Sequence, residues 1–178
     1  MLSNETLILK AKKIRLFFTD VDGTLTDGCT YYSASGEFMK KFSQIDGTGF
    51  FLLRQAGITA GIITGEVSEI VTRRAEKLRI KLCFMGIQNK LDFLQKFTIE
   101  QNVLLEEIAY IGDDLNDLLL LKNVGLSFAC GNSHPLIKKE VDICCETNGG
   151  AGAFREAVEN LLSLQNRDLY EIFNLVKS

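Results

Sequence analysis

The sequence has 178 residues, of which 46% are hydrophobic and 24% charged, and its formal net charge is −3. A chain of this length and composition can bury a sizeable core, so a disordered protein is not expected. The slightly acidic balance gives no general attraction to nucleic acid or to an anionic membrane, and no apolar stretch has the length of a membrane span. We therefore expect one cytoplasmic domain over residues 1–178 that binds neither nucleic acid nor a membrane.

Apolar segments with strand character alternate with helical segments along most of the chain. The predicted strands cover residues 14–19, 58–64, 81–85, 108–112, 126–129 and 141–145. The predicted helices cover residues 47–56, 67–78, 90–100, 115–122, 135–140 and 151–164. Such an alternation indicates a parallel sheet with helices on both faces, a doubly wound, Rossmann-like α/β fold. In this fold the ligand site lies at the carboxyl ends of the strands.

Two segments depart from this alternation. Residues 29–42, CTYYSASGEFMKKF, contain two short β-type runs around SASG and predict a β-hairpin flap. Its aromatic residues Tyr31, Tyr32 and Phe38 favour an interface over an ordinary flap. The tail at 165–178 has apolar residues at helical spacing and predicts a terminal amphipathic helix. These residues are Leu169, Ile172, Phe173 and Val176.

The cysteines and the histidine exclude several kinds of site. The number of cysteines is 5, two of them are adjacent, and no C-x-x-C motif occurs. This pattern argues against a disulfide framework and against a zinc site, so we expect reduced thiols. His134 is the only histidine, which leaves little for a histidine-based triad.

Polar residues suited to chemistry follow four of the predicted strands. Asp20 and Asp22 follow the first strand in FTDVDGTLTDG, and TGE at 64–66 follows the second. Lys90 begins the helix after the third strand, and GDDLND at 112–117 follows the fourth. Because parallel strands end at one edge of the sheet, we expect these groups to converge. Carboxylates from two strands suit Mg²⁺, and a hydroxyl, a helix N-terminus and a lysine suit a phosphate.

The four motifs DVDGT, ITG, a lysine after the third strand and GDDLND, in this order, resemble those of the haloacid dehalogenase-like phosphatases across residues 14–160. The resemblance implies a covalent phosphatase mechanism. Asp20 would be the nucleophile that forms an aspartyl-phosphate, and Asp22 would be the general acid and then the general base. Mg²⁺ would be held by Asp20, the backbone carbonyl of Asp22, and Asp113.

The same resemblance assigns the remaining motif residues. Thr64, Gly65 and Lys90 would bind phosphoryl oxygens. Asp114 and Asp117 would orient the site and Lys90.

Several of these residues also have simpler interpretations. Asp27 is expected to be a turn residue before Gly28. Thr64 could serve only as a helix cap, and Lys90 taken alone would be a solvated helix residue. GGAG at 149–152 could be a phosphate loop, although a flexible turn is the better interpretation because G-K-[ST] is missing.

The spacing of the motifs leaves no room for a cap domain. Between Asp22 and Thr64 there is space for the hairpin and one helix, and between Thr64 and Asp113 for helix, strand and helix. An open site needs another way to exclude water, and a neighbouring subunit would provide it. The hairpin after DG, the segment DGTG at 46–49, HPL at 134–136 and GGAGAFRE at 149–156 resemble the 3-deoxy-D-manno-octulosonate 8-phosphate phosphatases. This resemblance implies a homotetramer in which hairpins pack together and a neighbour covers each active site.

The substrate-binding residues are expected from the same resemblance. Glu66, Arg74 and Lys77 resemble the branch that acts on nononate and sialic acid 9-phosphates, since octulosonate phosphatases commonly have an arginine in place of Glu66. Arg74 and Lys77 are expected on one helix face, where they would hold a sugar-acid carboxylate or be solvated. Arg155 would contact substrate or an adjacent chain, or form a salt bridge on its own helix.

The octulosonate phosphate is the first candidate substrate, as it defines the broader class. A nononate or sialic acid 9-phosphate is the alternative. A catalytically weak oligomerisation module of a sugar-activating system is the alternative of another class.

Overall fold

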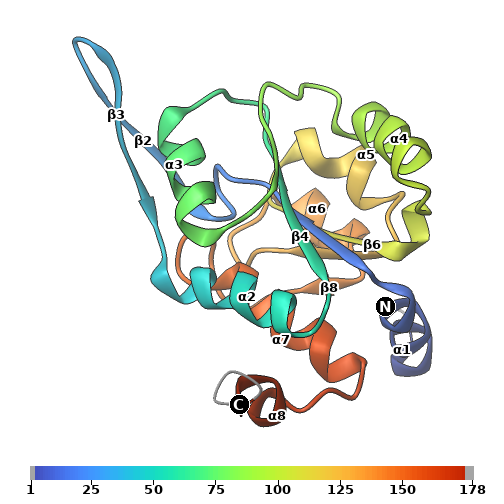
Figure 1. Ribbon diagram of the computed structural model, residues 1–178. Coiled ribbons are helices and arrows are strands. Elements are labelled where there is room, and N and C mark those ends of the chain that lie inside the picture. The colour runs from blue at the N-terminus through green and yellow to red at the C-terminus, as the bar shows by residue number, and fades with distance from the viewer. Residues whose placement is uncertain (1–2, 175–178) are drawn as a thin grey trace.

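The centre of the computed structural model, which describes residues 3–174, is a six-stranded parallel sheet (Figure 1). The strands lie in the order β5-β4-β1-β6-β7-β8. Their bounds are β1 Leu16–Thr19, β4 Thr59–Ile63, β5 Leu82–Phe84, β6 Ile108–Gly112, β7 Leu126–Ala129 and β8 Ile143–Cys144. Within the sheet, the chain passes from β1 through β4 to β5 at one edge, and then from β6 through β7 to β8 at the other edge. The predicted doubly wound fold is confirmed, and its strand order reverses between β1 and β6.

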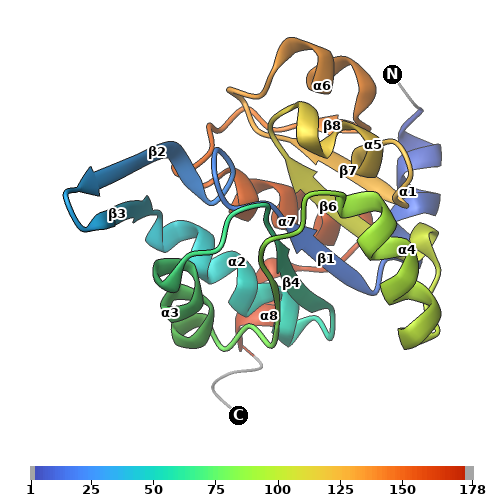
Figure 2. The same cartoon turned by 90° about the horizontal axis from the view of Figure 1, so that it is seen from above.

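Helices cover both faces of the sheet (Figure 2). One face carries α1 Asn4–Lys13, α2 Gln44–Gln55, α3 Glu69–Leu78, α7 Ala153–Leu164 and α8 Leu169–Asn174. The other face carries α4 Lys90–Gln101, α5 Leu118–Leu121 and α6 Pro135–Glu140. Two short 3₁₀ turns, η1 Leu105–Glu107 and η2 Leu115–Asp117, flank β6.

The side chains of each central strand alternate between two hydrophobic cores. Phe17 packs against the rings of Phe128 and Phe154 in one core, with ring centroids 5.4 Å away in both cases. Its neighbour Phe18 points to the other face, where it meets Phe97 edge-on at 5.5 Å. Because successive side chains of a strand point to opposite faces, an almost wholly apolar strand fills both cores.

The hairpin extends away from the sheet (Figure 1). Its antiparallel strands are β2 Thr26–Ser33 and β3 Gly36–Phe42, so the predicted hairpin is confirmed and begins slightly earlier than expected. Four large apolar side chains on it are exposed in the described protomer. They are Tyr31, Tyr32, Phe38 and Met39.

The helix α1 was not predicted from the sequence. Only Ala11 of this helix is buried, so its apolar pattern is too weak to read as an amphipathic helix. Ser3 caps it by accepting a hydrogen bond from the backbone N–H of Thr6 at 3.2 Å. The predicted terminal helix is confirmed as α8, but Val176 lies outside the described residues.

Elsewhere the boundaries shift at capping residues. Ser43 caps α2, which therefore begins earlier than predicted, and Ser68 caps α3, which begins later. The helix predicted at 115–122 is divided into η2 and α5. None of the helices within residues 3–174 combines the length and the apolar character that crossing a bilayer requires.

The packing of α7 gives a prediction about stability. Leu161 is fully buried, whereas Leu9 on α1 is 59% exposed. We expect Leu161→Ala to lower the free energy of unfolding by about 2–5 kcal/mol, because it leaves a cavity in the core. The matched Leu9→Ala should change it by less than about 0.5 kcal/mol. Urea unfolding followed by circular dichroism measures both values, and similar losses for the two variants would contradict the assignment of the core.

Candidate active site

The motifs predicted to be catalytic meet where the strand order reverses. Asp20 directly follows β1, and its backbone N–H donates to the carbonyl of Ile111 at 3.1 Å, which extends the β1–β6 pairing by one residue. Asp113 directly follows β6. The loop after β1 passes so close that a Cβ on Gly23, whose φ is +88°, would lie 2.0 Å from Oδ2 of Asp113. Only glycine fits there, so the short turn in DVDG allows the two carboxylates to come together.

Lys90 lies at the centre of this cluster. Its side chain is 1% exposed, and its Nζ lies 2.8 Å from Oδ1 of Asp20 and 2.7 Å from Oδ1 of Asp117. Nζ also donates to the hydroxyl of Tyr110 at 3.0 Å, and that hydroxyl donates to Oδ1 of Asp117 at 2.7 Å. The backbone N–H of Asp113 donates to Oδ2 of Asp117 at 3.1 Å. Asp117 is therefore fully engaged in holding Lys90 and the start of the Asp113 loop.

The crowding of buried carboxylates changes their protonation. Burial, and then the charge of Asp117, raises the pKa of Asp20 to about 7 against the opposing effect of Lys90. Burial and the charges of Asp20 and Asp117 raise the pKa of Asp113 to about 7. Burial alone would lower the pKa of Lys90, but the neighbouring carboxylates outweigh it and the pKa lies above its usual value. The cluster thus retains its ammonium ion and has an unmet demand for positive charge.

The donor set fits Mg²⁺. Carboxylate oxygens of Asp20, Asp113 and Asp117 lie within 4.8 Å of one another. Because Asp117 already accepts bonds from three donors, Asp20 and Asp113 are the carboxylates left to bind a cation. All-oxygen, anionic ligands are those that Mg²⁺ prefers.

The loop after β4 lies beside this cluster. Thr64 is 2% exposed, its N–H donates to the carbonyl of Phe84 at 3.0 Å, and its carbonyl accepts from the N–H of Ile87 at 3.0 Å. The side-chain amide of Gln88 donates to the carbonyl of Gly65 at 2.9 Å. The interpretation of Thr64 as a helix cap is wrong, because the hydroxyl that caps α3 belongs to Ser68.

These elements enclose a cavity of about 410 Å³. Its lining residues are Asp20, Asp22, Gly23, Gly28, Thr64, Gly65, Glu66, Gln88, Asp113, Asp114 and Asn116. The structure therefore brings the predicted motif residues from β1, β4 and β6 to one cavity, with Lys90 beneath it. Asp114 is exposed at its rim and accepts from the N–H of Leu115 at 2.8 Å.

Asp22 has a partner that the sequence did not reveal. Nζ of Lys40, on β3, lies 2.5 Å from Oδ1 of Asp22, and the Lys40 side chain is 2% exposed. Tyr110 was likewise missed, although a tyrosine in the otherwise apolar strand IAYIG carries a hydroxyl that must find a partner when buried. For Lys40 the neighbouring Lys41 made the pattern ambiguous.

The glycines of GGAG at 149–152 pack against the loop after β1. A Cβ on Gly149 would lie 1.8 Å from the carbonyl oxygen of Gly23, and the N–H of Gly150 donates to the carbonyl of Thr24 at 3.0 Å. The segment is a turn, as the sequence favoured, and it packs backbone to backbone against the loop after β1 without lining the cavity, so it is not a phosphate loop of this site. Asp27 accepts from the N–H of Cys29 at 3.1 Å, in agreement with a turn role.

Of the four predicted substrate-binding residues, only Glu66 lines the cavity. Arg74 is 9% exposed, and its Nη2 donates to the carbonyl of Ser43 at 2.8 Å. Lys77 on the same helix is exposed, so the two do not form one basic face. Arg155 pairs with Glu159 one turn along α7, with Nε 2.6 Å from Oε1.

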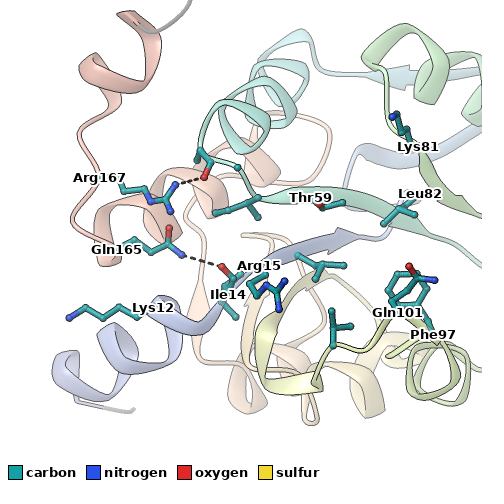
Figure 3. A pocket seen from close by; sticks show the side chains of 15 residues that line it. Lys12, Ile14, Arg15, Thr59, Lys81, Leu82, Phe97, Gln101, Gln165 and Arg167 are labelled. Carbon is teal, nitrogen blue, oxygen red and sulfur yellow. Dashed lines mark hydrogen bonds between the residues drawn. The ribbon is translucent and has the colours of Figure 1, made fainter. Parts of the chain in front are cut away.

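A larger cavity, of about 720 Å³, lies at the amino-terminal edge of the sheet and contains none of the catalytic motifs. Figure 3 shows Lys12 and Lys81 at opposite ends of it. Two further cations there already have partners: Arg15 pairs with Glu107 at 3.3 Å, and Arg167 donates to the carbonyl of Ala56. Its cations do not converge on one point, so its size does not make it the active site.

Comparison with known proteins agrees with this site. The family model described as haloacid dehalogenase-like hydrolase matches residues 74–156. The 3-deoxy-D-manno-octulosonate 8-phosphate phosphatase of Haemophilus influenzae is 39% identical over 158 residues, which cover 89% of this chain and 88% of that protein. The phosphatase of the same name from Escherichia coli is 39% identical over 165 residues, or 90% and 86% of the two chains.

A comparison with solved structures also finds phosphatases of this kind. The crystal structure of 3-deoxy-D-manno-octulosonate 8-phosphate phosphatase from Moraxella catarrhalis, in complex with a magnesium ion, a phosphate ion and a KDO molecule, superposes with a TM-score of 0.90. It is 37% identical, and the match covers 99% of this chain and 100% of that one. The protein described here therefore belongs to the 3-deoxy-D-manno-octulosonate 8-phosphate phosphatase family of the haloacid dehalogenase-like hydrolases.

Proposed function

We propose that this enzyme, a Mg²⁺-dependent phosphoric monoester hydrolase, removes the phosphate of a 2-keto-3-deoxy sugar acid, with 3-deoxy-D-manno-octulosonate 8-phosphate as the first candidate. The observation that carries the proposal is the juxtaposition of Asp20 and Asp113 at adjacent strand ends, with Nζ of Lys90 2.8 Å from Asp20. The names of the relatives support this choice of substrate.

The chain's own residues supply the chemistry in two displacements. An oxygen of Asp20 attacks phosphorus and forms an aspartyl-phosphate, while the bond from phosphorus to the sugar oxygen breaks. Asp22 gives its proton to the leaving sugar oxygen. Asp22 then takes a proton from the water that attacks the aspartyl-phosphate, which releases inorganic phosphate and regenerates Asp20.

The remaining groups bind the phosphoryl oxygens and balance charge. Lys90, the Thr64 hydroxyl and the Gly65 N–H would contact these oxygens. Asp20, Asp113 and the backbone carbonyl of Asp22 would hold Mg²⁺, which when bound offsets the negative charge of the phosphoryl group. Positioning and electrostatic stabilisation of this kind account for nearly all of the catalysis in phosphoryl transfer.

A nononate or sialic acid 9-phosphate is the second candidate substrate. The observation that favours it is the exposed Glu66 in the cavity wall, where octulosonate phosphatases commonly carry an arginine. Arg74, Lys77 and Arg155 remain predicted substrate contacts, and any such contact would have to arise in an assembly. The gathering of the motif residues at one cavity, with Lys90 bonded to Asp20 beneath it, favours an enzyme over a catalytically weak oligomerisation module.

The proposed assembly is a homotetramer in which a neighbouring subunit covers each active-site cavity. It is supported by the motif spacing, which leaves the cavity without a cap domain, and by the exposed apolar side chains of the hairpin. The proposed location is the cytoplasm, which agrees with the five free cysteines.

Measurement of phosphate release from three sugar-acid phosphates tests the function. We expect the highest kcat/KM for octulosonate 8-phosphate, with nononate and sialic acid 9-phosphates as the comparison, and no turnover without Mg²⁺. Asp20→Asn should abolish turnover because it removes the nucleophile, while the circular dichroism spectrum is unchanged. Preference for a nine-carbon substrate would replace the first candidate by the second, and substantial turnover by Asp20→Asn would exclude the covalent mechanism.

The binding of Mg²⁺ should depend on pH. Because the pKa values of Asp20 and Asp113 are both raised to about 7, protons compete with the metal below that pH. We expect the apparent Mg²⁺ affinity of the free enzyme to fall by about tenfold per pH unit below pH 7 for each proton displaced, and to level off above pH 8. Calorimetric titration in buffers of different ionisation enthalpy counts the protons released. An affinity that is constant from pH 6 to pH 8 would contradict this.

The proposed assembly predicts the behaviour of hairpin variants. The double variant Tyr32→Ser/Phe38→Ser removes two exposed rings, 75% and 69% exposed, so we expect smaller oligomers and a lower rate. Tyr170→Ser is the control, because its ring is 76% exposed at a distance from the hairpin. Light scattering coupled to gel filtration gives the molecular mass. A fully active monomer of the double variant would refute completion of the site by a neighbour.

A further inference from the structure

We propose that Lys40 is a positioning residue for the catalytic acid Asp22, so that the hairpin is part of the catalytic machinery of its own protomer. This inference rests on the proposed function, because it needs Asp22 to deliver a proton. It concerns a residue outside all four motifs.

Three oxygen atoms surround the ammonium group of Lys40. Its Nζ lies 2.5 Å from Oδ1 of Asp22, 3.2 Å from Oγ1 of Thr30 and 3.2 Å from Oε1 of Glu37. A lysine ammonium has three N–H donors, and each has an acceptor here. The side chain is 2% exposed, whereas that of Lys41 is 66% exposed on the opposite face of the same strand.

Asp22 depends on this contact for its orientation. It lies in the turn after β1 and is half-buried, with 29% of its side chain exposed, so burial alone does not fix its rotamer. The ammonium ion of Lys40 fixes Oδ1. Oδ2 is then the oxygen left to carry the proton, and a general acid must present that proton within hydrogen-bond reach of the leaving oxygen.

The same lysine connects the two catalytic loops. Glu37, its second carboxylate partner, also accepts a hydrogen bond from the hydroxyl of Ser68, which caps α3. A continuous polar chain therefore runs from Asp22 through Lys40 and Glu37 to the end of the loop that begins at Thr64. The strand β3 thus fixes the loop of Asp22 relative to the loop that begins at Thr64.

Stability alone does not account for the arrangement. Burying an ion pair brings little net stability, because the cost of removing two charges from water offsets their attraction. A lysine in this position beside a catalytic carboxylate is therefore better explained by orientation of that carboxylate.

The leaving group of the substrate separates this role from a purely structural one. An alkoxide leaving group needs a proton from Asp22, whereas p-nitrophenolate leaves as a stable anion. The ratio kcat/KM reports the steps up to formation of the aspartyl-phosphate, in which only the alkoxide requires the acid. Loss of orientation at Asp22 should therefore affect a sugar-acid phosphate far more than p-nitrophenyl phosphate.

The test compares Lys40→Met with the matched control Lys41→Met. We expect Lys40→Met to lower kcat/KM by about 10²-fold for the best sugar-acid phosphate of the panel and by less than about tenfold for p-nitrophenyl phosphate. Lys41→Met should leave both values within about twofold of wild type. Circular dichroism and light scattering establish that fold and assembly are retained.

A second variant, Glu37→Gln, keeps a hydrogen-bond acceptor for Ser68 and removes the charge that Lys40 faces, so we expect a smaller loss of the same leaving-group-dependent kind. It serves as the test if Lys40→Met does not fold. Equal losses for the two substrates, or no loss, would overturn the role of Lys40. Wild-type enzyme that releases phosphate from neither substrate would instead refute the proposed function.

Discussion

The active site depends on one buried ammonium ion held between carboxylates. Lys90 lies within 2.8 Å of both Asp20 and Asp117, and no more than 1% of its side chain is exposed. When all groups are ionised, the three carboxylates of the cluster carry two more negative charges than Lys90 can balance. Removal of one partner from a buried pair costs about 3–5 kcal/mol, so the positions of these side chains are strongly constrained. The excess negative charge still attracts a further cation. This imbalance explains why the site suits Mg²⁺ and then a phosphate.

The fold positions this cluster through backbone proximity. The reversal of strand order puts the ends of β1 and β6 side by side, and glycines let the loops come within contact distance. Gly112 shows the same constraint as Gly23, since a Cβ there would lie 2.3 Å from Oδ2 of Asp117. The close approach of these carboxylates thus requires a glycine beside them, and the segments DVDG and IGDD contain one each.

The sequence predicts those parts of the site that follow from topology. Asp20, Asp113 and Lys90 each stand at a strand or helix end, and parallel strands carry such ends to one edge. Helical periodicity was less informative for Arg74, because it indicates which residues share a face but not what covers that face. Arg74 is covered by the junction of β3 and α2, while Lys77 is exposed. The burial of Lys40 rather than Lys41 is decided by tertiary contacts that no local pattern contains.

The hairpin combines two properties. It carries Lys40 and Glu37, which reach the loops of the active site, and it also exposes aromatic rings such as Tyr32 and Phe38. A subunit that packs on those rings would restrain β3, and β3 bonds directly to Asp22. In an enzyme without a cap domain, assembly would therefore affect catalysis through the orientation of the acid as well as by covering the cavity. A neighbour that packs on the hairpin would then restrain Asp22 through Lys40 even where that neighbour contacts no substrate.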